Sequence, residues 1–143
     1  MRNYWDAIEP SDSPKYVAWQ KLNDVVASIA RLEDILFPSV YTFYEDQDGW
    51  SKYAVQQIQE ARRIGKGKPV YVFLWQEYEV PKEKAPGTYI PPKYWHMELE
   101  IASKYADGIV IWGGWSETWD ETAPWWRETK SFLQQVGSPP KKR

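Results

Sequence analysis

The sequence predicts an α/β fold in which three to four parallel strands alternate with helices. Two segments, Pro69–Trp75 and Ile109–Trp112, are almost continuously apolar, which is typical of strands that are covered on both faces in a parallel sheet. Segments with helical periodicity separate them, and this alternation predicts helical crossovers. A chain of 143 residues suits one domain, which we expect over residues 1–136, followed by a disordered basic tail over 137–143.

The remaining elements follow from local patterns. Residues 16–35 are predicted to be helical because apolar side chains recur there at three- and four-residue spacing, at Leu22, Val25, Val26, Ile29 and Leu32. Residues 36–44 are β-branched and aromatic, which predicts a strand with Pro38 near its start. Similar patterns predict helices over 50–64, 93–105 and 124–136 and allow a short first strand over 2–5.

Composition excludes several classes of function. The formal net charge is -2, so no overall basic field attracts nucleic acid, and Lys141–Arg143 is interpreted as a solvated tail. The absence of cysteine excludes disulfides and thiolate ligands, and the single histidine, His96, excludes a His/Cys zinc site. No apolar run reaches the ~18 residues of a membrane span, and no signal peptide opens the chain. We therefore expect a soluble protein with no cofactor, no metal and no membrane partner.

Aromatic residues are unusually abundant, at 17 % of the chain with 10 Trp and 10 Tyr. Both side chains combine a flat apolar face with a hydrogen-bonding edge. Sugar rings have apolar C–H faces and polar rims, so this composition favours a glycan ligand. The alternative is that these side chains fill the core.

Three segments resemble hyaluronidases in their order and spacing. Leu36–Tyr41 is similar to the family's "(L/M)-x-P-S-(I/V)-Y" strand, and Glu60–Arg63 with Lys68–Phe73 resembles the next helix and strand. Ala106–Gly113 resembles the family's last barrel strand, which reads "x-x-G-I-V-(I/L)-W-G". The match covers about residues 36–115.

This resemblance implies the C-terminal half of a TIM-type (β/α) barrel of the glycoside-hydrolase kind. A complete barrel needs about 250 residues, which exceeds this chain. In the family, an Asp-x-Glu at the end of the fourth strand supplies the general acid, and the substrate's acetamido group is the nucleophile. Asp6 and Glu9 follow no strand of the matching type. The resemblance therefore implies a fragment that lacks the family's catalytic acid.

Carboxylates follow each expected strand, where barrel active sites gather. By position alone the candidates for the general acid are Glu45, Glu77 and Glu117, and glycoside hydrolysis needs two carboxyl groups across the sugar ring. The alternative for each is a helix-capping or solvated role.

Aromatic side chains stand at the same strand ends and are candidates for contact with substrate: Tyr4, Tyr41, Trp75, Trp112 and Trp115. The resemblance implies this role for Tyr41 and Trp112, whose positions contact substrate in the family, and for Tyr4 by a weaker match. Burial in the core is the alternative.

Half a barrel would leave an open sheet, so we expect a homodimer or a separate N-terminal half-barrel as partner, together with a glycan. The sequence is compatible with three alternative functions. These are a glycoside hydrolase or half of one, a carbohydrate-binding protein without catalysis, and a structural remnant.

Overall fold

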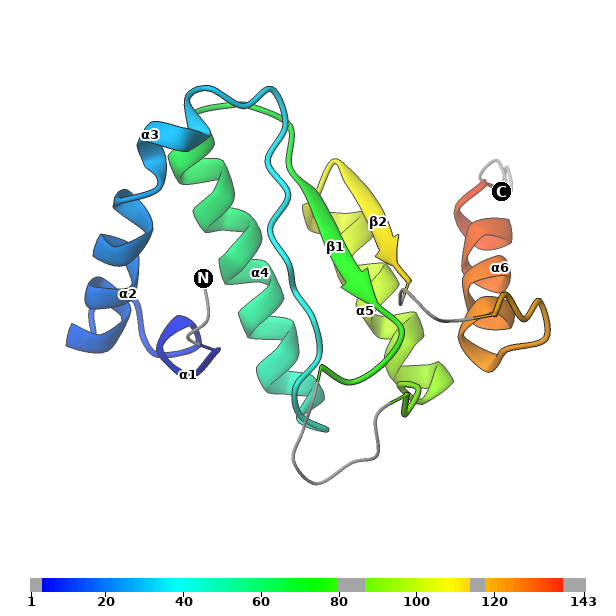
Figure 1. Cartoon of the computed structure of the whole chain (residues 1–143). Helices are drawn as coiled ribbons and strands as arrows, with labels where there is room; N and C mark the ends of the chain where they lie inside the picture. The colour runs from blue at the N-terminus through cyan, green and yellow to red at the C-terminus, as the bar shows by residue number, and fades with distance from the viewer. Residues whose placement is uncertain (1–3, 80–86, 114–117, 138–143) are drawn as a thin grey trace, which may run out of the picture.

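The structure of the chain is a computed structural model that describes residues 4–79, 87–113 and 118–137. Six helices and two strands occur in these ranges (Figure 1): α1 Tyr4–Ala7, α2 Pro14–Asp24, α3 Ala27–Ala30, α4 Gln47–Gly65, β1 Tyr71–Trp75, α5 Pro92–Tyr105, β2 Gly108–Trp112 and α6 Pro124–Gly137. The helices predicted over 50–64, 93–105 and 124–136 are thereby confirmed as α4, α5 and α6.

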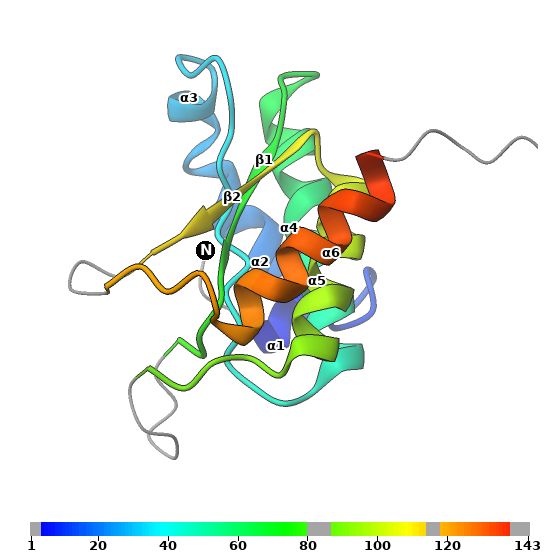
Figure 2. The same ribbon diagram turned by 90° about the vertical axis from the view of Figure 1, so that its right-hand side faces the viewer.

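The two strands form a parallel pair in which Tyr71 lies opposite Gly108 and Trp75 lies opposite Trp112. The odd-numbered side chains of β1 are half-buried, whereas Val72 and Leu74 between them are fully buried. Helices α4, α5 and α6 lie on one side of the strands (Figure 2). The buried side chains face these helices, and the half-buried ones form the other, more open face of the sheet.

The expected half-barrel with three to four parallel strands is wrong, because only β1 and β2 are strands in the described part of the chain. The segment predicted as a strand over 36–44 runs beside β1 but forms only isolated bridges there. Ser39 pairs with Phe73 of β1, while Leu36 and Thr42 pair with Val70 and Tyr78 on either side of the strand. The separate N-terminal half-barrel that was expected as a partner stays a prediction. The homodimer stays a prediction.

The ladder between this segment and β1 is interrupted for two reasons. Pro38 has no N–H, so it cannot donate to the carbonyl that faces it across the ladder. Farther on, the Val40 carbonyl accepts a bond from Trp50 Nε1 of α4 at 3.1 Å and is diverted from the neighbouring strand. A regular parallel ladder needs both an N–H at residue 38 and a free carbonyl at Val40.

The N-terminal third also differs from its prediction. Of the short strand allowed over 2–5, residues 4 and 5 belong to helix α1 instead, and residues 2 and 3 lie outside the described residues. The single helix predicted over 16–35 is replaced by α2 and α3. Most of the predicted apolar stripe faces solvent, and Leu32 is 86 % exposed, whereas Val26 is half-buried against the core. The buried face is formed by other residues, which are Tyr16, Trp19, Asn23 and Ala30.

A polar cluster attaches α2 to α4. The Glu60 carboxylate is buried on α4 and accepts hydrogen bonds from Asn23 at 3.1 Å and from Gln20 at 3.2 Å. Arg63 donates to the same carboxylate at 2.7 Å and to Asp24 at 2.6 Å. The buried charge is therefore paired and hydrogen-bonded, as burial of a carboxylate requires.

None of the described helices combines the length and the apolar character that crossing a membrane requires.

Candidate functional site

A pocket with a volume of about 380 Å³ opens at the carboxyl ends of β1 and β2. Gln76 follows β1 directly, Trp112 ends β2, and the first turn of α6 supplies Trp125 and Trp126. The remaining walls come from residues between these elements: Tyr89, Thr118, Trp119, Asp120 and Ala123, with Ile111 and Gly113 at the end of β2. The carboxyl ends of parallel strands are where α/β proteins commonly bind ligands.

Three tryptophans form one aromatic cluster in this pocket. The Trp119 ring centroid lies 5.0 Å from that of Trp126 and 6.0 Å from that of Trp125, and both contacts are edge-to-face. The rings of Trp125 and Trp126 lie 5.7 Å apart at a tilt of 60°. These separations are those at which aromatic pairs stabilise one another, so the cluster is a preformed wall.

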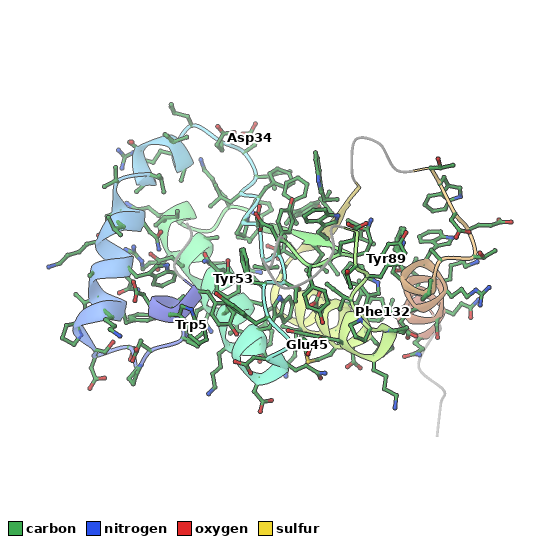
Figure 3. All side chains as sticks on the ribbon, turned by 60° about the horizontal axis from the view of Figure 1, so that its bottom comes forward. Trp5, Asp34, Glu45, Tyr53, Tyr89 and Phe132 are labelled. Atoms are coloured by element: carbon green, nitrogen blue, oxygen red, sulfur yellow. The ribbon has the colours of Figure 1, made fainter. Side chains whose placement is uncertain are left out.

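The depth of the three rings differs. Trp125 is buried, Trp126 is half-buried, and Trp119 is 62 % exposed. Tyr89 is also exposed, at 40 %, and lies toward α6 at the side of the sheet opposite Tyr53 and Trp5 (Figure 3). The inner rings therefore support the wall, while Trp119 and Tyr89 present aromatic surface to solvent.

Asp120 places a carboxylate at the mouth of the pocket. Its Oδ1 accepts hydrogen bonds from Thr122 Oγ1 at 2.7 Å and from the Thr122 amide at 2.8 Å. These bonds lower the pKa of the exposed Asp120 carboxyl, so it is charged at neutral pH and accepts hydrogen bonds only. Such a group suits hydroxyl donors and repels acidic ligands.

The pocket is better suited to binding than to acid–base chemistry. Glycoside hydrolysis uses two carboxyl groups on opposite sides of the scissile bond, and Asp120 is the one carboxylate among the described residues that line the pocket. No cluster of three or more metal-ligating side chains occurs in the described ranges either.

The two carboxylates predicted as catalytic that lie within the described residues do not line the pocket. Glu45 is exposed and directly precedes the N-cap of α4, which is Asp46. Glu77 is buried just after β1 and forms an isolated bridge with the pocket residue Tyr89. Neither side chain lines the pocket, and Glu117 lies outside the described residues.

Among the aromatic residues predicted to bind substrate, Trp112 lines the pocket. Tyr41 and Trp75 form an edge-to-face pair on the open face of the sheet with centroids 5.8 Å apart. Tyr4 is buried against Tyr53, and burial together with the nearby carboxylate of Asp46 raises the pKa of its phenol. Trp115 lies outside the described residues.

The sequence prediction missed Trp119, Trp126 and Tyr89 as pocket residues. One signal could have found the first two, because five of the ten tryptophans fall between residues 112 and 126. Five tryptophan side chains within fifteen residues are more than one short helix can bury against the sheet, so this concentration predicts exposed tryptophans. Tyr89 carries no comparable signal in the sequence.

No protein-family model matches the chain, and no curated protein matches it. The resemblance to hyaluronidases therefore stays a prediction.

Proposed function

We propose that this protein binds carbohydrate at the tryptophan pocket between β2 and α6, without cleaving it. The observation that supports this most strongly is the exposed Trp119 ring, held in place by Trp125 and Trp126 beside an open volume of about 380 Å³. A preformed aromatic platform covers the apolar face of a pyranose ring with little loss of side-chain freedom on binding.

The polar residues define the class of glycan. Asp120 accepts hydrogen bonds from sugar hydroxyls, and its negative charge disfavours uronic or sialic acids at the same position. Gln76 and Thr118 supply further hydrogen-bonding groups in the wall. The ligand class is therefore a neutral oligosaccharide.

Intrinsic tryptophan fluorescence tests this function. We would titrate the protein with neutral hexasaccharides of glucose, mannose and N-acetylglucosamine, and with a hyaluronan hexasaccharide as the acidic comparison. We expect at least one neutral hexasaccharide to bind with a Kd below about 1 mM and the acidic one to bind more weakly. Binding of none of them would contradict the proposal.

A matched pair of variants assigns the binding to the pocket. Trp119→Ala removes the exposed platform and should weaken binding at least about tenfold, which is 1.4 kcal/mol. Trp5→Ala is the control, because Trp5 is 55 % exposed and lies outside the pocket, and it should leave the affinity unchanged. Equal losses in both variants would contradict the assignment.

Hydrolysis is the second candidate and rests on Glu77, a buried residue that follows β1 and whose backbone forms a bridge with that of the pocket residue Tyr89. Product analysis of the bound hexasaccharide after prolonged incubation tests it. Shorter oligosaccharides that are formed by the wild-type protein and not by Glu77→Gln would establish cleavage.

A further inference from the structure

A second candidate site lies at the edge of the sheet that β2 does not occupy. The segment 36–43 runs along β1 on the side away from β2 (Figure 1). Its even-numbered residues bond to the β1 side, for example Val40 N–H to Phe73 O at 3.0 Å and Phe73 N–H to the Pro38 carbonyl at 3.0 Å. In an extended chain, adjacent residues direct their backbone N–H and C=O groups to opposite edges. The N–H and C=O groups of residues 37, 39, 41 and 43 therefore point away from β1.

Among the described residues, no backbone group pairs with this outer edge. Within the described part of the chain, none of Phe37, Ser39, Tyr41 and Phe43 makes a hydrogen bond from backbone to backbone. Phe37 and Ser39 are exposed, and Tyr41 and Phe43 are half-buried. The chain therefore presents donors and acceptors that recur every second residue, about 6.6 Å apart. An exposed row of this kind is a template for another extended polypeptide.

A hollow of about 280 Å³ adjoins the same edge. Its wall consists of the four edge residues with Pro38, of Tyr53 and Gln57 from α4, and of Glu79. Gln57 is 0 % exposed, and neither its Nε2 nor its Oε1 has a hydrogen-bond partner among the described residues. A buried amide without a partner destabilises the free protein, so a ligand that supplies both a donor and an acceptor is favoured there.

We propose that the edge of segment 36–43 binds an extended peptide by strand addition, with an asparagine or glutamine side chain of the peptide paired with Gln57 in the hollow. Two amide groups satisfy each other reciprocally, because each has an acceptor oxygen and a donor nitrogen. Phe37, Tyr41 and Phe43 surround the apolar part of that side chain, while Glu79 disfavours an acidic residue beside it. A glycan offers no backbone with a matching two-residue repeat.

This site is separate from the tryptophan pocket, since no residue lines both. If the peptide proposal failed, the carbohydrate proposal would be unaffected, and failure of the carbohydrate proposal would likewise leave the peptide proposal unaffected.

Fluorescence anisotropy tests the proposal with two labelled nine-residue peptides. Both alternate threonine and valine between terminal lysines, and they differ only at the centre, where one has glutamine and the other leucine. We expect the glutamine peptide to bind the wild-type protein at least tenfold more tightly. In Gln57→Leu this preference should disappear, and the thermal midpoint of unfolding should rise because an unpaired buried amide is removed.

Ser39→Pro tests the contribution of the backbone. Proline removes the outward N–H, and none of the hydrogen bonds between the segment and β1 uses the nitrogen of Ser39. We expect both peptides to bind at least tenfold more weakly, with Ser39→Ala as the control that keeps the N–H. Should Ser39→Pro fail to fold, the loss of preference in Gln57→Leu still decides the matter.

Three results would overturn the proposal. One is absence of binding of the glutamine peptide up to about 1 mM, and another is an unchanged preference for glutamine in Gln57→Leu. The third is a dimer, measured by light scattering, that Ser39→Pro converts to a monomer, because the edge would then belong to a second copy of this chain.

Discussion

The Thr42 hydroxyl donates a hydrogen bond of 2.6 Å to Glu98 Oε1, and this buried contact joins the segment beside β1 to helix α5. Both residues are 0 % exposed. Glu98 Oε2 has no partner among the described residues, so one half of the carboxyl group is buried without compensation. Burial raises the pKa of the Glu98 carboxyl well above its ordinary value of 4.5, and the bond from Thr42 lowers it by a smaller amount.

This raised pKa predicts a specific dependence of stability on pH. Above pH 4.5 the unfolded chain releases the proton that the folded protein keeps on Glu98. Stability therefore falls as pH rises from there to the folded pKa, by up to about 1.4 kcal/mol per pH unit. Glu98→Gln should be more stable than the wild-type protein at pH 7 and should lack this slope.

Urea unfolding of both proteins between pH 4 and pH 8 measures the effect. Glutamine keeps the acceptor oxygen for Thr42, so the variant tests the charge and not the hydrogen bond. A variant that is less stable than the wild-type protein at pH 7 would contradict the expectation.

Arg63 is expected to stabilise the packing of α2 on α4 through the buried Glu60. Arg63→Met keeps the apolar stem and removes donors at 2.7 and 2.8 Å from the carboxylate. We expect a loss of about 2 kcal/mol in the free energy of unfolding, because Gln20 and Asn23 then remain as the partners of a buried charge. The control is Arg31→Met, on an exposed side chain, which should change stability by less than about 0.5 kcal/mol.

Two leucines with opposite environments test the corrected packing of the sheet and the N-terminal helices. Leu74 on β1 is 0 % exposed, whereas Leu32 after α3 is 86 % exposed. We expect Leu74→Ala to cost about 2–5 kcal/mol and Leu32→Ala to cost less than about 0.5 kcal/mol. Chemical denaturation measures both, and a large cost at Leu32 would indicate that this residue is covered in solution by another molecule, such as a second copy.

The sequence predicted those elements whose local pattern admits one interpretation. Continuous apolar runs indicated β1 and β2, because few environments other than a covered sheet accept so many apolar side chains in a row. Val72 and Leu74 belong to the first run, and Ile109 belongs to the second. The pattern over 124–136 indicated α6, and Pro124 stands in its first turn, where proline is favoured.

Tertiary contacts decided the elements that were predicted wrongly. Residues 36–44 do not form a regular strand, in part because Trp50 Nε1 of helix α4 donates a hydrogen bond to the Val40 carbonyl. Trp50 lies outside the ladder, and no local pattern shows this contact. The apolar stripe that includes Leu22 and Leu32 has helical spacing, but spacing does not show which face of a helix packs inward. Trp19 packs inward instead.

The candidate site was predicted in part. Trp112 was found because it ends an apolar strand, and strand ends gather ligand sites. Trp119 belongs to no helix or strand, and its contact with Trp126 depends on how the chain returns from β2 to α6. That path is a property of the three-dimensional fold and not of a local pattern.

The indole N–H signals of the protein in two-dimensional proton–nitrogen NMR test the carbohydrate site most directly, because each tryptophan reports from its own position. On titration with the hexasaccharide that binds best, we expect the signals of Trp112, Trp119 and Trp126 to shift, while those of Trp19 and Trp50, which are buried elsewhere, stay in place. Shifts confined to tryptophans outside the pocket, or none with any hexasaccharide, would contradict carbohydrate binding at this site.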